Sequence, residues 1–195
     1  FKQKLGFSEE KKYIALLPGS RKSEIKNHLK ILEDLTKIYS SSNPNYQFVL
    51  SLTKDNSTSE EKYLQEKNIT MIKGNTREVL KACDYGIVSS GTATLEAMLS
   101  KTPFCVIYKS NALSNFVISS ILLKLDYISL PNILANKKII PELRQNNVTP
   151  RKIKNELDNL IEGSNESMLE EFEKLHHSLF NKDENKFSKI IENLI

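Results

Sequence analysis

The sequence has no tryptophan, only two cysteines and no long apolar run. No window supplies the roughly 20 apolar residues that a membrane-spanning helix needs, and no signal peptide is visible. Aromatic residues make up 8% of the chain, and RNP-like and helix-turn-helix motifs are missing, which argues against a nucleic-acid-binding domain. Cys83 and Cys105 lack zinc-type spacing and lie in apolar runs, so we expect buried, free thiols of a reduced cytoplasm.

The 195 residues suit one compact domain, with or without a helical appendage. Because the chain begins at Phe1 rather than Met, we expect a piece of a longer protein that lacks its N-terminal part. Residues 1–149 carry 21 Lys and Arg against 14 Asp and Glu, whereas residues 150–195 carry 7 against 10. A basic body with an acidic tail fits phosphate, nucleic acid or an anionic lipid surface, and charge does not choose among them.

Short apolar runs alternate with segments of helical period. The expected strands are Tyr13–Leu17, Gln47–Leu50, Ile69–Ile72, Tyr85–Ser89 and Phe104–Tyr108, and the expected helices lie near Glu24–Tyr39, Ser59–Glu66, Thr76–Ala82, Ala93–Leu99 and Leu113–Lys124. The strands show little polar alternation, as expected when both faces of a sheet are covered. In the first helix we expect one buried stripe, formed by Ile25, Leu29, Leu32, Leu35 and Ile38.

The strand signals stop after Leu130-Pro131-Asn132. A helix should then begin with Thr149 as its N-cap and Pro150 in its first turn. Further helices are expected near Ser167–Leu179 and Asn185–Leu194. The alternation predicts an α/β, doubly wound (Rossmann-like) parallel sheet of about six strands with a helical C-terminal tail. We divide the chain into a ligand-binding domain, residues 1–149, and a tail, residues 150–195.

Leu17-Pro18-Gly19-Ser20-Arg21 follows the first strand, where open parallel sheets bind their ligands. Gly19 would let the backbone approach a ligand, Ser20 offers a hydroxyl, and the Arg21 guanidinium matches phosphate oxygens. Alternatively, Arg21 is an ordinary surface residue. Neither the GxGxxG dinucleotide fingerprint nor the phosphate-binding P-loop is present.

The segment Ser89–Glu96 follows the strand Tyr85–Ser89 and opens a helix. Its small residues, Ser90, Gly91, Thr92, Ala93 and Thr94, would expose backbone N–H groups that favour an anion. Glu96, one turn further, could accept hydrogen bonds from a diol. Alternatively, Ser90 or Thr92 merely caps the helix.

Two anion-competent turns in one sheet point to a diphosphate held between them, and a nearby carboxylate suits a ribose. A nucleotide diphosphate is therefore the simplest ligand. A nucleophilic role for Ser90 is disfavoured because the G-x-S-x-G elbow is missing. The three histidines, His28, His176 and His177, fall in helical stretches, and we expect them at the surface.

Four motifs occur in order: Leu16-Leu17-Pro18-Gly19-Ser20-Arg21 with Glu24-Ile25, Ser90–Glu96, Leu130–Ala135, and Pro141-Glu142-Leu143 with Gln145. Together they closely resemble the bacterial lipid-A-disaccharide synthase family, whose members are two-domain GT-B glycosyltransferases. The resemblance is strong from about Lys12 to Gln145 and loose in the tail. It implies that this chain is the C-terminal half, which binds the UDP-sugar donor.

The resemblance implies transfer from UDP-2,3-diacylglucosamine to 2,3-diacylglucosamine 1-phosphate, giving the lipid A disaccharide precursor and UDP, without a metal or other cofactor. Arg21 would bind the diphosphate, with Gly19 and Ser20 shaping the turn and the Gly91–Thr94 backbone assisting. Glu96 would bind the ribose, and Asn132 would line the donor site. Glu142 and Gln145 match family positions, Gln145 being assigned to the donor site. The general base and the acceptor-binding surface would lie in the missing half.

The family is peripheral on the cytoplasmic face of the inner membrane. Residues 112–125 could form an interfacial helix, although a helix covering the sheet is the simpler interpretation. Two other functions stay open: another GT-B UDP-sugar enzyme, such as a UDP-sugar 2-epimerase, and a basic nucleic-acid-binding domain. A homodimer is also left open.

Overall fold

Six parallel strands form one open sheet in the computed structural model, which describes residues 1–52, 69–110 and 125–180. The strands are β1 (Lys12–Leu17), β2 (Tyr46–Leu52), β3 (Ile69–Lys73), β4 (Tyr85–Ser89), β5 (Phe104–Tyr108) and β6 (Glu142–Arg144). Their order is β3-β2-β1-β4-β5-β6, so the direction of winding reverses between β1 and β4. This is the order of a doubly wound Rossmann-like sheet, which confirms the predicted fold class.

Apolar side chains on both faces of the central strands build two cores. Because side chains alternate along a strand, Ile14 and Leu16 of β1 belong to one core, whereas Ala15 and Leu17 belong to the other. All four are at most 4% exposed. Covering both faces explains why the central strands carry continuous apolar runs.

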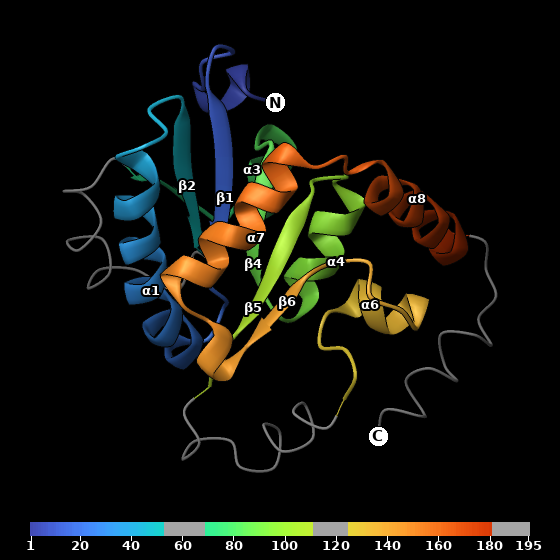
Figure 1. The fold of residues 1–195 in the computed structure, drawn as a ribbon. Coiled ribbons are helices and arrows are strands. Elements are labelled where there is room, and N and C mark those ends of the chain that lie inside the picture. The colour runs from blue at the N-terminus through green and yellow to red at the C-terminus, as the bar shows by residue number, and fades with distance from the viewer. Residues whose placement is uncertain (53–68, 111–124, 181–195) are drawn as a thin grey trace.

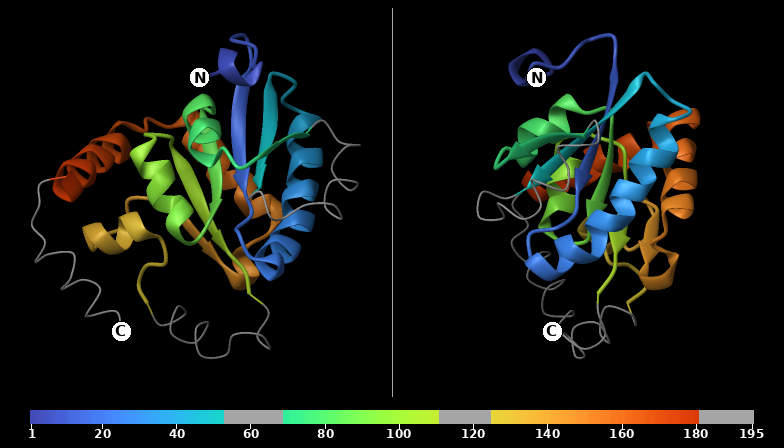
Figure 2. Two further views of the ribbon diagram at one scale, coloured as in Figure 1. Left: turned by 180° about the vertical axis from the view of Figure 1, so that it is seen from behind. Right: turned by 90° about the vertical axis from the view of Figure 1, so that its left-hand side faces the viewer.

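Helices cover both faces of the sheet (Figures 1 and 2). The helices are α1 (Lys22–Ser40), α3 (Thr76–Ala82), α4 (Thr92–Leu99), α6 (Leu130–Ala135), α7 (Pro150–Glu162) and α8 (Glu166–Phe180), with 3-10 turns at Gln3–Leu5 and Gln145–Asn147. Helices α1 and α7 pack together on one face. Helices α3 and α4 cover the other face, where α6 and α8 pack against α4.

The predicted start of the C-terminal helices is confirmed. Pro150 lies in the first turn of α7, and the Thr149 hydroxyl accepts a hydrogen bond from the Lys152 N–H at 3.3 Å. On the other face, Phe172 of α8 is fully buried, with its ring centroid 5.8 Å from that of Phe104. Both helices thus pack on the sheet domain, while the boundary at residue 149 stays a prediction.

Two elements after residue 129 were not predicted, and one of them, a strand, contradicts the expectation that the strand signals end after Asn132. Residues Glu142–Arg144 form the edge strand β6, in parallel register with Val106–Tyr108 of β5. Leu130–Ala135 forms the short helix α6. The helices expected at Ser59–Glu66, Leu113–Lys124 and Asn185–Leu194 lie outside the described residues.

The buried stripe of α1 is rotated from the predicted one. It includes Ile25, His28, Leu32, Leu35 and Tyr39, whereas Leu29 is partly buried against the same core and Ile38 is 46% exposed. The surface prediction for His28 is therefore wrong: its side chain is fully buried, because it lies one turn after Ile25 on the face that meets the sheet.

Cys83 and Cys105 are both buried and free, as predicted. Burial raises the pKa of the Cys105 thiol to about 12.

Among the helices that the structure describes, none combines the length and apolar character that crossing a membrane requires.

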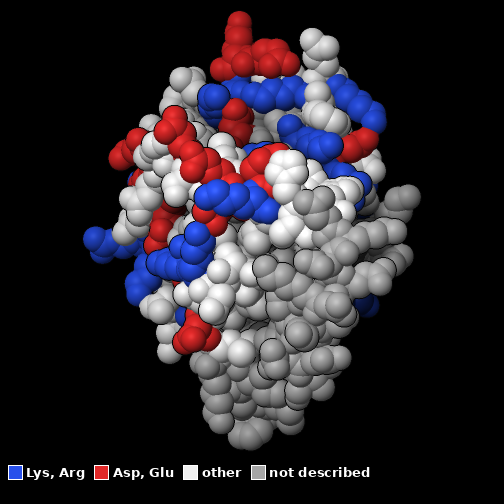
Figure 3. All heavy atoms as spheres, turned by 90° about the vertical axis from the view of Figure 1, so that its right-hand side faces the viewer, with Lys and Arg blue, Asp and Glu red and all other residues white. Residues whose placement is uncertain are grey.

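Helix α8 is tied to neighbouring elements by the ion pairs Lys101–Glu173 and Lys137–Glu171. On the face drawn in Figure 3, basic and acidic side chains are interspersed over the described residues. The described Lys and Arg side chains are therefore not gathered into one continuous patch on that face.

Candidate functional site

A pocket of about 310 Å³ opens at the carboxyl ends of β1 and β4, where the strand order reverses. The β1–α1 turn and the β4–α4 turn both line it, together with Ser51 of β2 and Thr76 of α3. Open parallel sheets bind ligands at this position. The predicted site residues that line the pocket are Gly19, Ser20, Arg21, Ser90, Gly91, Thr92, Ala93 and Glu96.

The β1–α1 turn requires glycine at position 19. Gly19 has a φ of +115°, and a Cβ there would lie 2.5 Å from Glu24 Oε2. The Glu24 carboxylate accepts hydrogen bonds from the N–H groups of Ser20 (3.3 Å) and Arg21 (3.4 Å). Glu24 therefore caps the start of α1, a task that the Arg21 guanidinium cannot perform because it has no acceptor.

Arg21 lies at the pocket with 73% of its side chain exposed. Its Nη1 donates to Glu24 Oε1 at 3.1 Å. A guanidinium carries five N–H donors, so this contact orients Arg21 while most of its donor capacity can still reach a ligand.

The β4–α4 turn presents the start of α4 without a side-chain cap. Gly91 is the N-cap residue, with a φ of +136°, and among the described residues no side chain caps the first turn. The Ser90 hydroxyl donates to the Ile128 carbonyl at 2.8 Å instead, and the Thr94 hydroxyl donates to the Gly91 carbonyl at 2.7 Å. The capping alternative for Ser90 and Thr92 is therefore not what the structure has, and the first N–H groups of α4 can meet an anion.

Glu96 lines the pocket one turn beyond the start of α4. Within the described ranges, its carboxylate has no hydrogen bond or ion pair with another side chain or with the backbone. The lining also includes two neighbouring hydroxyls, Ser51 Oγ and Thr76 Oγ1, 3.2 Å apart. The pocket thus combines a cation, uncapped helix N–H groups, hydroxyls and a carboxylate acceptor.

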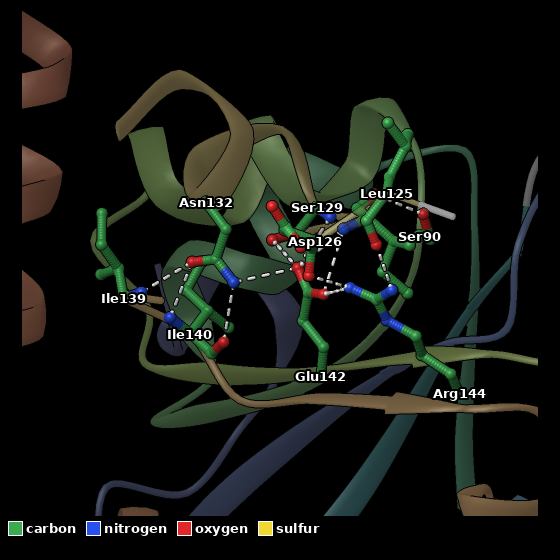
Figure 4. A network of polar contacts seen from close by, with 10 residues as sticks. Ser90, Leu125, Asp126, Ser129, Asn132, Ile139, Ile140, Glu142 and Arg144 are labelled. Atoms are coloured by element: carbon green, nitrogen blue, oxygen red, sulfur yellow. Dashed lines mark hydrogen bonds and ion pairs between the residues drawn. The ribbon is translucent and has the colours of Figure 1, made fainter. Parts of the chain in front are cut away.

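A network of polar contacts is centred on Glu142 and extends to Ser90 of the β4–α4 turn (Figure 4). The Glu142 carboxylate, 6% exposed, accepts from the N–H of Ile128 (3.0 Å), the N–H of Ser129 (2.9 Å) and the Ser129 hydroxyl (2.7 Å). It also accepts from Asn132 Nδ2 (2.9 Å) and from Arg144 Nη2 (2.8 Å). A buried carboxylate is stable only when its oxygens are paired in this way.

The network reaches the pocket through Ile128–Leu130. Glu142 holds the backbone of Ile128 and Ser129, while the Ile128 carbonyl accepts from Ser90 and the Leu130 N–H donates to Thr94 Oγ1 at 3.2 Å. The motifs around Ser90, Leu130 and Glu142 are therefore parts of one hydrogen-bonded unit.

Three predicted site residues lie outside the pocket lining. Thr94 is fully buried beneath the turn. Asn132 is also fully buried: its amide donates to Ile140 O and to Glu142, and its carbonyl accepts from the N–H groups of Ile139 and Ile140. Gln145, at a φ of +49°, contacts the backbone N–H and the hydroxyl of Ser110.

Other residues of the site are not among those predicted from the sequence. Glu24 belongs to the first of the four motifs, and its i to i+3 spacing from Arg21 is typical of a capping box. The positions of Ser51, near the end of β2, and Thr76, shortly after β3, in the pocket could have been predicted, because the carboxyl ends of neighbouring parallel strands meet at one edge of the sheet. Arg144 donates to the carbonyls of Leu125 and Asp126 as well as to Glu142, contacts that local sequence does not reveal.

No group of three or more His, Cys, Asp or Glu side chains that could hold a metal occurs in the part of the chain that the structure describes. The expectation of a metal-free site stays a prediction.

The sheet order and the layers are those of one Rossmann-like half of a GT-B glycosyltransferase fold. The family model described as lipid-A-disaccharide synthetase matches residues 1–192. The chain belongs to this family.

Lipid-A-disaccharide synthase of Vibrio vulnificus strain YJ016 is 35% identical over 178 residues, which are 89% of this chain and 47% of that protein. The chain thus spans about half the length of the curated relatives it matches. WaaG, a glycosyltransferase involved in lipopolysaccharide biosynthesis, has a similar fold, with a TM-score of 0.57, 13% identity, and 99% of this chain and 48% of that one covered.

A Listeria monocytogenes structure described as a UDP-N-acetylglucosamine 2-epimerase also matches, with a TM-score of 0.53, 11% identity, and 84% of this chain and 39% of that one covered. The fold alone therefore does not separate a transferase from an epimerase.

Proposed function

We propose that this chain is the donor-binding half of a lipid-A-disaccharide synthase and that its pocket binds the UDP group of UDP-2,3-diacylglucosamine. One observation carries the proposal: Arg21 and the uncapped start of α4 line the same pocket, at the switch point of the sheet. A nucleoside diphosphate carries its charge on the two phosphates, and these are the groups that a guanidinium and helix N–H groups stabilise.

In this proposal the diphosphate lies between Arg21 and the backbone of Gly91–Ala93. Glu96 accepts hydrogen bonds from the ribose hydroxyls, a role supported by its position in the lining and by the lack of a described partner. Positive groups at the diphosphate stabilise the charge that develops on the leaving UDP. Gly19 and Ser20 form the turn that carries Arg21.

The remainder of the reaction is assigned to the part of the relatives that this chain does not span. It includes the general base and the surface that binds 2,3-diacylglucosamine 1-phosphate. The proposed products are the lipid A disaccharide precursor and UDP, formed at the cytoplasmic face of the inner membrane. Family membership supports this assignment. The sequence resemblance assigns Asn132 and Gln145 to the donor site. In this proposal they contribute indirectly, by holding the loops that they contact.

Calorimetry tests the pocket directly. Arg21→Ala should weaken UDP binding by about tenfold to a hundredfold, because hydrogen bonds to charged groups contribute roughly 1.5–3 kcal/mol. Arg151→Ala, which removes an exposed arginine of α7, is the matched control and should bind like wild type. Uridine, which lacks phosphates, should bind Arg21→Ala and wild type equally. Equal UDP affinity in all three proteins would contradict the phosphate role of Arg21.

The reaction itself is tested on the protein extended to the full length of its relatives. It should form a disaccharide from the two diacylglucosamine substrates and release one UDP for each product. A UDP-sugar 2-epimerase, which the Listeria likeness keeps as the alternative, would release no disaccharide. Tight, salt-dependent binding of single-stranded RNA that UDP does not affect would favour the nucleic-acid alternative.

A further inference from the structure

His28 occupies a position in α1 that the proposed chemistry leaves without a role. Its side chain is fully buried, and both ring nitrogens have partners. Nδ1 lies 2.7 Å from the Pro18 carbonyl oxygen, and Nε2 lies 3.1 Å from the Lys109 backbone nitrogen. Pro18 immediately precedes Gly19 of the β1–α1 turn, and Lys109 immediately follows β5.

The two partners fix the protonation state of the ring. A carbonyl oxygen can only accept, so Nδ1 carries the proton and donates to Pro18. A backbone N–H can only donate, so Nε2 has no proton and accepts from Lys109. The imidazole is therefore the neutral Nδ1–H tautomer, and neither nitrogen can change its role without losing a hydrogen bond.

The neighbouring residue also binds Lys109, since Asn27 Nδ2 donates to the Lys109 carbonyl at 3.3 Å. The first turns of α1 thus connect the turn that carries Arg21 to the end of β5. A buried histidine with two backbone partners restricts the turn more than an apolar residue of similar size would, because breaking either bond leaves a buried polar group unpaired.

We propose that His28 is a positioning residue of the pocket: its Nδ1–H bond to the Pro18 carbonyl sets the β1–α1 turn in the conformation that presents Arg21 to a nucleoside diphosphate. The assignment rests on the proposed function of the pocket. It concerns the Pro18 bond in particular, and the Lys109 bond serves to fix the tautomer.

Two substitutions separate the two bonds. The amide nitrogen of asparagine can take the place of Nδ1 and donate to Pro18, whereas the longer glutamine side chain can place its oxygen near Nε2 and accept from Lys109. His28→Asn should keep UDP affinity within about threefold of wild type, and His28→Gln and His28→Ala should lose about tenfold, the value of one hydrogen bond. Exchange of the Lys109 amide should follow the reverse order, slow in His28→Gln and faster in His28→Asn and His28→Ala.

Equal losses of UDP affinity in His28→Asn and His28→Gln would overturn the assignment, because a residue that only fills space does not distinguish the two bonds. Unchanged affinity in all variants would overturn it as well. His177→Asn, at an exposed site of α8 with 74% of the side chain accessible, is the matched control and should match wild type. If wild type itself binds no UDP, the proposed function fails and the assignment fails with it.

A measurement on wild type keeps the proposal testable if the variants do not fold. Nitrogen NMR of the His28 ring should show the Nδ1–H tautomer, and adding UDP should shift the Nδ1 resonance because the Pro18 bond responds to the ligand. An Nε2–H tautomer, or an Nδ1 resonance that UDP binding leaves in place, would overturn it.

Discussion

Replacing Glu142 by alanine should lower the free energy of unfolding by about 3–5 kcal/mol, the typical cost of breaking a buried ion pair. The change removes the acceptor for the N–H groups of Ile128 and Ser129, the Ser129 hydroxyl, Asn132 Nδ2 and Arg144 Nη2. Each neutral donor left buried and unpaired costs roughly 1–3 kcal/mol. We take the low end of their sum because Arg144 is 23% exposed and water can enter the space.

Glu142→Gln divides the network. Oε1 accepts from Ile128, Ser129 and Asn132, whereas Oε2 accepts from Ile128 and Arg144. A glutamine can keep an oxygen at the first position, but its NH₂ then faces donors at the second. We expect a loss of about 1–3 kcal/mol, smaller than for alanine.

Urea unfolding followed by circular dichroism measures both losses. Asp34→Ala is the control, since Asp34 is 38% exposed and its pair with Lys30 at 3.2 Å lies on the helix surface. Such pairs contribute about 0.3–0.5 kcal/mol. If Glu142→Ala costs no more than Asp34→Ala, the network does not stabilise the fold and the reasoning is refuted. Because Glu142 holds the Ile128–Leu130 backbone, the same variant should also weaken UDP binding.

Two further changes test the turn and the buried imidazole. Gly19→Ala should cost about 1–3 kcal/mol, because its Cβ would lie 2.5 Å from Glu24 Oε2 at a φ of +115°; Gly6→Ala, with a φ of +71° and open space around the Cβ, should cost less in the same thermal unfolding assay. Burial lowers the pKa of His28 from 6.5, against the opposing effects of the Pro18 bond and Glu24, while Lys109 lowers it further. Below about pH 6.5 the unfolded chain therefore binds a proton at His28 that the folded chain does not bind. The free energy of unfolding then decreases as the pH is lowered, by at most about 1.4 kcal/mol per pH unit. His28→Asn should flatten this slope, and an unchanged slope would show that His28 does not cause it.

The central strands could be predicted because burial on both faces leaves an uninterrupted apolar run. The edge strand β6 could not, since it has three residues and only Leu143 is buried. Glu142 and Arg144 flank it as polar residues, so the segment has no apolar run to detect. Its place in the sheet is set by pairing with β5, a contact between segments more than thirty residues apart.

The α1 stripe illustrates a different limit. Ile25, Leu32 and Leu35 were predicted as buried, but the period accommodates either Leu29 and Ile38 or His28 and Tyr39. Hydrophobicity favours the first pair, whereas the structure buries the second, leaves Leu29 partly buried against the same core and exposes Ile38. His28 can be buried because polar partners exist for its imidazole. Those partners belong to other elements and are invisible in the helix itself.

In the site, the two turns could be predicted because a glycine and small polar residues follow directly after strands that end at one edge. For residues such as Asn132 and Gln145, the local sequence does not show whether the side chain holds a loop or contacts a ligand. Only their partners decide: Asn132 uses its amide on Ile139, Ile140 and Glu142.

The hydrogen bonds that join Ser90 and Thr94 to Ile128–Leu130, and these to Glu142, have a consequence for exchanging parts between relatives. A chimera that imports residues 125–145 must receive donors and acceptors that fit the host's Ser90–Thr94 segment, although more than thirty residues separate them. Recombination breakpoints between β4 and β6 should therefore be harmful, because they separate the Ser90–Thr94 segment from the residues that hold it. The part of the pocket built on the β4–α4 turn is thus inherited together with a stretch of about sixty residues, from β4 to β6, which is much longer than the turn itself.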